Sequence, residues 1–231
     1  MKFPKLIPAK LIKRHNRFSA GVRLEDGKLA DVYVPTTGRL TGVLHPGCQV
    51  WLEPADNPAR KTRFTMALAE LESGGLCSTN AHLANRLFYE SVKKGELSAF
   101  TCPVIDREVT FGNSRLDFRL SDGGQACWIE VKSVTYAEGG IGRFPDAPTG
   151  RGRRHLGELA KAVARGDQAS VVFITQREDA HKFAPFEAID PAFAEILRQI
   201  FEVGVEIHAY RCQVSTKNIK IAEEIPVDLY A

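Results

Sequence analysis

The pattern of apolar residues changes near residue 80, and this change constrains the fold more than any other feature of the 231-residue chain. Residues 9–75 form short strand-like runs separated by turns rich in Gly, Pro, Asn and Asp, with no long helical pattern. Turns are expected at 25–28, 36–39, 45–47 and 54–60. Their spacing predicts about five strands that close into a small β-barrel, placed in residues 1–78.

Residues 79–231 instead alternate helices with strands. Apolar residues at helical spacing predict helices at 80–97, at 153–165 and from Pro191 to a cap at Gly204. Three strand-like runs lie between the first two helices, and a fully apolar strand and a last strand follow at 169–175 and 205–214. The order is αβββαβ, so we expect a multidomain α+β chain with a barrel followed by an α/β domain.

Two acids and a lysine in the α/β region form a candidate metal site. The SDGG sequence at 121–124 predicts a hairpin turn that would bring Asp117 alongside Glu130. Glu130 and Lys132 are two residues apart on a predicted strand, so they share one face. Two carboxylates with open positions suit Mg²⁺ or Mn²⁺, and the lysine could orient an attacking water or stabilise developing charge. A solvated cross-strand charge pattern is the alternative.

The chain has a basic N-terminal part, although its formal net charge is only +3. Residues 1–75 hold 12 Lys and Arg against 7 Asp and Glu, whereas residues 76–231 hold 19 against 21. Such an excess indicates contact with a phosphate backbone or, equally, a solvated basic face. The aromatic residues Phe18, Tyr33 and Trp51 suit either base stacking or the barrel core. The predicted DNA-binding residues are Lys13, Arg14, Arg17, Arg60, Lys61, Arg115, Arg143, Arg151, Arg153 and Arg154.

The segment 137–154 is rich in Gly and Pro and is predicted to be a long loop directly after the strand of Glu130. It contains no nucleotide-binding glycine motif, so its arginines are expected to hold the DNA backbone; a flexible solvated loop is the alternative.

The five cysteines are scattered, and none belongs to a C-x-x-C pair, which argues against a disulfide framework or a structural zinc site. No stretch approaches the length and apolarity of a membrane span or a signal peptide. A cytoplasmic protein without membrane contact is therefore expected.

Several sequence blocks, in this order, resemble the sugar fermentation stimulation protein A family. They include LIKRHNRF at 11–18, TGRLTGVLHPGCQVWL at 37–52, FGNSRLDF at 111–118, EVKSVT at 130–135 and FPDAPTGRGRRHLGEL at 144–159. The resemblance runs nearly end to end. It implies an oligonucleotide-binding (OB) barrel followed by a restriction-endonuclease-like domain of the PD-(D/E)xK superfamily. The αβββαβ order independently supports that second domain.

The resemblance also implies roles for single residues. Asp117 and Glu130 resemble the metal-binding acids, Lys132 resembles the third motif residue, and Glu90 resembles a helix carboxylate that some branches add as a ligand. Thr36 stands where the family pattern has asparagine. The expected function is sequence-nonspecific DNA binding, with a regulatory role in sugar metabolism implied by the resemblance. The alternative is a DNA nuclease dependent on Mg²⁺ or Mn²⁺; the sequence leaves the oligomeric state open.

Overall fold

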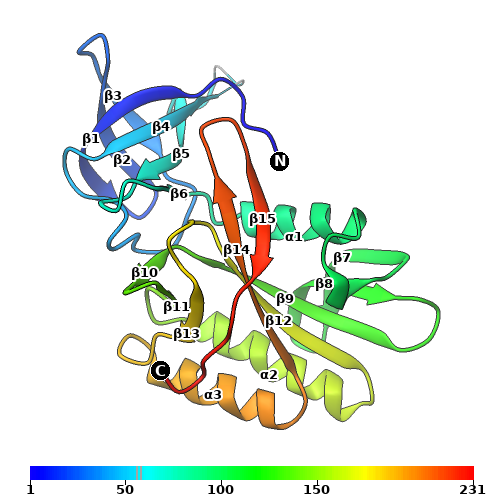
Figure 1. Ribbon diagram of the computed structural model, residues 1–231. Coiled ribbons are helices and arrows are strands. Elements are labelled where there is room, and N and C mark those ends of the chain that lie inside the picture. Colours follow the sequence, from blue (N-terminus) through cyan, green and yellow to red (C-terminus); the bar gives the residue numbers. More distant parts are fainter. Residues whose placement is uncertain (56, 58) are drawn as a thin grey trace.

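The computed structural model describes residues 1–55, 57 and 59–231, and it contains a barrel followed by an α/β part (Figure 1). Part of the turn predicted at 54–60 thus lies outside the described residues. The barrel strands are β1 (Ile7–Asn16), β2 (Ser19–Leu24), β3 (Leu29–Tyr33), β4 (Gln49–Pro54), β5 (Phe64–Glu70) and β6 (Leu76–Ser78).

The predicted barrel is confirmed. The strands hydrogen-bond in the order β3-β2-β1-β4-β5-β6, and an additional pairing of β3 with β5 closes five of them into a ring. Alternate residues point inward, so Val22, Val50, Leu52 and Met66 are fully buried in one core. The part of the barrel before the turn predicted at 25–28 is a hairpin, and Arg17 and Phe18 form its turn between β1 and β2.

The α/β part has thirteen elements among the described residues. They are α1 (Leu83–Lys93), the 3₁₀ turn η1 (Ser98–Phe100), β7 (Val104–Phe111), β8 (Ser114–Ser121), β9 (Ala126–Val134), β10 (Tyr136–Glu138), β11 (Ile141–Phe144), α2 (Gly150–Ala164), β12 (Gln168–Thr175), β13 (Lys182–Pro185), α3 (Pro191–Glu202), β14 (Glu206–Val214) and β15 (Ile219–Glu224). The main sheet has the order β15-β14-β12-β9-β8-β7, and β10, β11 and β13 form a small second sheet.

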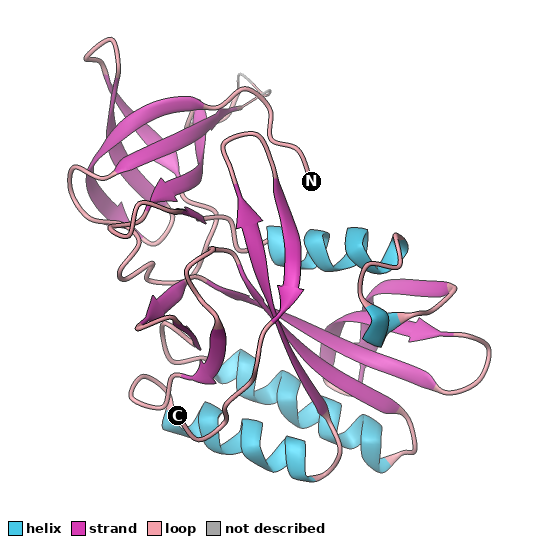
Figure 2. Cartoon of the chain, viewed as in Figure 1, coloured by secondary structure: helices cyan, strands magenta, loops and turns pink. Residues whose placement is uncertain are grey.

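Helices cover both faces of the main sheet (Figure 2). On one face α1 packs Leu87 and Phe88 against Ile129 and Val131 of β9. On the other face α2 and α3 bury an apolar cluster of their own with β12, which includes Phe173. Strand β9 lies between these two cores and pairs in parallel with β12, so its side chains must point into one helical layer or the other.

The segment 137–154 is not the long loop that the sequence predicts. Gly139 and Gly140, both at positive φ, turn β10 into β11, and α2 begins at Gly150. The helix begins before 153 because the Thr149 hydroxyl accepts a hydrogen bond from the Gly152 N–H at 3.0 Å, which is a typical N-terminal cap.

The barrel and the α/β part contact each other at several points. The first residues of the chain bond to the turn between β14 and β15, where the amino terminus donates to the Ile219 carbonyl and the Phe3 N–H to that of Lys217. From the barrel, the Leu40 N–H donates to the Asp146 carboxylate at 3.0 Å. No helix in the described part of the chain is long and apolar enough to cross a membrane.

Candidate functional site at the open edge of the β8–β9 hairpin

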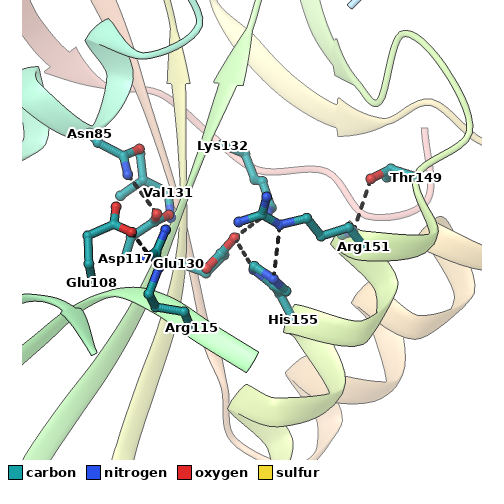
Figure 3. Close-up of polar contacts among 11 residues, drawn as sticks. Asn85, Glu108, Arg115, Asp117, Glu130, Val131, Lys132, Thr149, Arg151 and His155 are labelled. Carbon is teal, nitrogen blue, oxygen red and sulfur yellow. Dashed lines mark hydrogen bonds and ion pairs between the residues drawn. The ribbon is translucent and has the colours of Figure 1, made fainter. Parts of the chain in front are cut away.

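Strands β8 and β9 separate at Asp117, and its side chain fills the gap. The predicted hairpin is confirmed, with ladder pairs from Ser121 opposite Ala126 to Phe118 opposite Ile129. One residue further along, Asp117 lies opposite Glu130 in the same register, but its carboxylate replaces the backbone as partner of β9. Its Oδ2 accepts from the Val131 N–H at 2.8 Å, and its Oδ1 accepts from Asn85 Nδ2 of α1 at 2.6 Å (Figure 3).

Strand β7 is distorted at the same level. Glu108 has a φ of 54°, in the left-handed region that a residue with a side chain rarely adopts. The pairing of β7 with β8 is interrupted at Glu108 and Asp117 and resumes in the same register between Val109 and Leu116. Glu108 also forms an exposed ion pair with Arg115 at 2.8 Å. The distortion therefore coincides with the acidic residue that the sequence singles out.

Glu130 has a buried carboxylate in which one oxygen contacts two donors and the other oxygen contacts none. Its side chain is 4% exposed, and Oε1 lies 2.5 Å from both Lys132 Nζ and His155 Nδ1. Oε2 is buried and has no hydrogen-bond partner among the described residues. Since a buried carboxylate oxygen without a donor is costly, this position favours an added cation or donor.

The tautomer of His155 follows from its two neighbours. Arg151 Nε donates to His155 Nε2 at 3.3 Å, and an arginine can only donate. Nε2 therefore accepts, and Nδ1 carries the proton that it donates to Glu130. Arg151, His155 and Glu130 thus form one chain of hydrogen bonds from the first turns of α2 to β9.

The two acids have opposite electrostatic surroundings. Burial, and then the negative charge of Glu130, raise the pKa of Asp117 to about 6. Burial also opposes ionisation of Glu130, but the charge of Lys132 and the hydrogen bond from His155 outweigh it and lower the pKa of Glu130. The pair therefore places one carboxylate whose charge is favoured beside one that gives up its proton less readily than an ordinary aspartate.

The structure brings together Asp117, Glu130 and Lys132, but it does not bring Glu90 to them. Glu90 pairs with Arg86 at 3.0 Å and with the amino terminus at 3.6 Å. Asn85 is the residue of α1 that contacts the site, and sequence reasoning did not assign it. The described residues contain no group of three or more acids, histidines or cysteines arranged to hold a metal.

His155 lies in the family-like block 144–159, but the sequence leaves open whether its role is functional or structural. Its position four residues after Arg151 places the two on the same helical face, directly before the buried Leu156. The spacing does not predict that His155 is buried. The residue is only 2% exposed, and a hydrogen bond to the Glu130 carboxylate is stronger in such a buried environment than in water.

A cavity of about 280 Å³ lies beside the site and is walled by both parts of the chain. Arg17 and the turn around Thr36 line it from the barrel, and Lys132 and Arg151 line it from the α/β part. Thr36 keeps its turn in place because its hydroxyl accepts from the Gly38 N–H at 3.1 Å. The structure thereby unites basic residues predicted from two distant segments.

The predicted DNA-binding residues differ in whether their side chains already bind other parts of the protein. Arg14 donates to the Arg17 and Gly38 carbonyls at 2.7 and 2.9 Å, and Arg153 donates to Asp190 at 2.6 Å, so both serve the fold. Arg115 is paired with Glu108, and Arg143 donates to the Ala231 carbonyl at 3.2 Å. Six of the predicted residues are exposed and have no acidic partner in the part of the chain that the structure describes: Lys13, Arg17, Arg60, Lys61, Arg151 and Arg154.

Comparison with known proteins agrees with this arrangement of two parts. A family model described as "SfsA N-terminal OB domain" matches residues 12–79, and one described as "Sugar fermentation stimulation protein RE domain" matches residues 82–218. A sugar fermentation stimulation protein homolog of Maricaulis maris is 43% identical over 99% of both chains. A homolog of Geobacter sulfurreducens is 41% identical over 94% of both chains.

A solved structure extends the similarity to three dimensions. The structure of Pyrococcus furiosus SfsA in complex with Ca²⁺ superposes with a TM-score of 0.90, at 31% identity, over 99% of this chain and 98% of that one.

Proposed function

The chain belongs to the sugar fermentation stimulation protein family, and on this basis we propose that it binds DNA without sequence preference across the junction of its barrel and its α/β part. The observation that carries the proposal is the cavity that Arg17 of the barrel shares with Lys132 and Arg151. Basic side chains from two domains around one concave surface suit a phosphate backbone.

The turn that carries Arg17 adds a base-stacking side chain. Phe18 is 49% exposed, although phenylalanine in a barrel is usually part of the core. An exposed aromatic residue beside a basic side chain is the arrangement by which OB barrels hold single strands, and Arg17 next to Phe18 has no acidic partner among the described residues. Lys13 lies exposed on the adjoining strand β1.

The experiment is a binding titration of the purified protein with labelled single-stranded and double-stranded DNA at several salt concentrations. We expect binding to several unrelated sequences with similar affinity, weakening steeply as salt rises because counterions are released. Failure to bind any of them at low salt would refute the proposal.

A second function, metal-dependent phosphodiester hydrolysis, is favoured by the unpartnered Oε2 of Glu130. Asp117 and Glu130 would hold Mg²⁺ or Mn²⁺, and the Ca²⁺ in the solved relative supports a divalent cation in this family. When bound, such an ion supplies Lewis acidity and lowers the pKa of a bound water. Two carboxylates are fewer ligands than a complete protein site, which leaves positions for water and a phosphate oxygen.

The residues around these acids have distinct tasks in that reaction. Lys132 places a positive charge next to Glu130, where it can stabilise the charge that develops on a phosphate. His155 fixes the orientation of the Glu130 carboxylate by a hydrogen bond from helix α2. Asn85 and the Val131 N–H fix Asp117 in the same way.

A binding-only protein is the competing account, and the same contacts give it one argument. Each carboxylate already has two protein donors, so the acids are partly satisfied without a cation. Incubation of single-stranded and double-stranded DNA with and without Mg²⁺ or Mn²⁺ separates the two accounts. Cleavage that requires the metal supports hydrolysis, and intact DNA under every condition supports binding alone.

The location and the physiological role remain part of the proposal. All five cysteines are free, which is typical of a reducing compartment and supports a cytoplasmic location. A regulatory role in sugar metabolism rests on the family name.

A further inference from the structure

The cavity beside Glu130 has a positive charge that the protein does not neutralise. Lys132 is paired with Glu130, and Asp146, the only acid that lines the cavity among the described residues, lies near Arg14 and accepts from the Leu40 N–H. Arg17 and Arg151 have no acidic partner in the described part of the chain. These two arginines therefore give the cavity an excess of positive charge over the one carboxylate, Asp146, that lines it.

The N-terminus of α2 adds hydrogen-bond donors at the same place. Thr149, Arg151 and Gly152 of its first turn line the cavity. The backbone N–H groups of Gly150 and Arg151 have no acceptor among the described residues. The first turns of α2 contain no acid and three arginines, although the positive end of a helix dipole disfavours cations. The Asp190 carboxylate offsets part of this by accepting from the Thr149 N–H at 2.8 Å and pairing with Arg153, and a bound anion could accept from the remaining N–H groups.

Thr135 provides an independent sign of a ligand. It is 8% exposed and lines the cavity, and its hydroxyl makes no hydrogen bond to any described residue. Its backbone carbonyl, in contrast, accepts from Arg177 Nη1 at 2.9 Å, so the residue is held firmly in place. The hydroxyl is not among the fully buried atoms without a partner, so it is accessible from the cavity and available to an oxygen atom of a ligand.

The size and charge of the cavity define the ligand. A volume of about 280 Å³ lies at the lower end of ligand pockets, so it can admit one phosphate with its sugar but no stretch of duplex. An internal phosphodiester carries one negative charge, whereas a terminal phosphate monoester carries roughly two at neutral pH. Arg17 and Arg151, which have no acidic partner in the described part of the chain, can each contact a free oxygen of the monoester, and the doubly charged monoester gains more than the diester from the excess positive charge.

We propose that this cavity binds the terminal phosphate of a nucleic-acid strand and so directs the protein to strand ends. The inference rests on the proposed DNA binding and adds the feature of DNA that is recognised. With the end held between Arg17, Arg151 and the N-terminus of α2, the strand leads past Lys132 towards Glu130 and Asp117. The ligand chemistry is shared by 5′ and 3′ phosphates, and the experiment distinguishes them.

The test compares oligonucleotides of one sequence that carry a 5′ phosphate, a 3′ phosphate or hydroxyls at both ends, together with a closed circle. Fluorescence anisotropy in Ca²⁺ measures their affinities for the full chain. We expect one phosphorylated end to bind at least about tenfold more tightly than the hydroxyl ends and the circle. Equal affinities for all four would overturn the inference and leave DNA binding intact, whereas no binding to any of them would overturn both.

Three variants test whether the cavity causes the preference for a phosphorylated strand end. Arg151→Gln should bring the affinity ratio close to one. Thr135→Val, which preserves shape and does not touch the chain of bonds to Glu130, should lower the ratio several-fold. Arg154→Gln is the matched control, because Arg154 lies in the same part of α2 but does not line the cavity. It should weaken all four ligands alike and retain the ratio; an unchanged ratio in both cavity variants would overturn the inference.

Discussion

The imidazole of His155 lies 2.5 Å from the carboxylate of Glu130, and both side chains are almost completely buried. This contact joins α2 to the central strand β9 at the point where the sequence places the candidate metal ligand. The carboxylate is thereby fixed in orientation before any cation or DNA arrives. Such preorganisation is what a metal site requires of its surrounding residues.

Replacing His155 should therefore weaken the site without removing a ligand. In His155→Gln we expect Ca²⁺ affinity, measured by isothermal titration calorimetry, to fall by about 10- to 100-fold. His208→Gln serves as the control, since His208 also contacts two carboxylates but lies on β14 away from Asp117. Equal Ca²⁺ affinities in the wild type and His155→Gln would show that the histidine is only a packing residue.

Replacing the carboxylate itself should separate cleavage from binding. Glu130→Gln keeps the size of the side chain but removes its charge, so metal-dependent cleavage should fall at least about 100-fold. DNA affinity should stay the same or rise, because a negative charge facing the phosphates is lost. Cleavage rates and anisotropy titrations of the same protein preparations measure both effects. Cleavage at the wild-type rate would exclude Glu130 as a ligand.

The raised pKa of Asp117 predicts a dependence of stability on pH in the absence of metal. Between its ordinary value of 3.8 and about 6, the folded protein binds more protons at Asp117 than the unfolded chain does. The contribution of Asp117 to the free energy of unfolding therefore falls as pH rises through this window, by at most about 3 kcal/mol, and levels off above it.

Urea unfolding of the wild type and of Asp117→Ala, in steps from about pH 4 to about pH 7, isolates this contribution. As pH rises, the free energy of unfolding of the wild type should fall relative to that of Asp117→Ala. A difference that stays constant would mean that Asp117 ionises normally in the fold.

The β7–β8 turn allows a sharp test of packing. A Cβ on Gly112, whose φ is 55°, would lie 2.3 Å from Oε2 of the buried Glu158. Gly139 has nearly the same φ, 56°, but nothing within 4 Å of an added Cβ. Gly139→Ala should thus cost only the backbone strain of about 1–2 kcal/mol. Gly112→Ala should cost about 1–3 kcal/mol more in chemical denaturation, and equal losses would show that Glu158 moves aside freely.

Sequence patterns predict the elements of this fold where local signals are strong. The hairpin over 121–124 has a clear turn sequence between alternating strands, so the placement of Asp117 opposite Glu130 could be predicted. The short strands β10, β11 and β13 could not, because runs of three or four residues are too short to show a periodicity. The closed barrel itself could be predicted, but not that β3 and β5 close it, because that pairing is a contact between distant segments.

Residues that reach the site from other elements were the least predictable. Asn85 and His155 lie on helices, and helix packing decides which of their side chains meet β9. Glu90 lies five residues after Asn85, which on an α-helix is a rotation of about 140°, so the two cannot face the same point. The family-like helix carboxylate thus points towards the amino terminus instead.

A charge reversal at the cavity tests most directly whether DNA binds at the junction of the barrel and the α/β part. Arg17→Glu combined with Arg151→Glu removes two positive charges from opposite walls, one in the barrel and one on α2. Arg23→Glu combined with Lys220→Glu makes the same change in net charge at exposed positions that do not line the cavity. Each protein is titrated with labelled DNA over a range of salt concentrations.

We expect the cavity variant to bind all DNA sequences more weakly, and the slope of log affinity against log salt to fall by about two, one for each lost phosphate contact. The control variant should lose much less affinity and nearly retain the wild-type slope. Equal losses in the two variants, or an unchanged affinity in the cavity variant, would contradict DNA binding at the junction of the barrel and the α/β part.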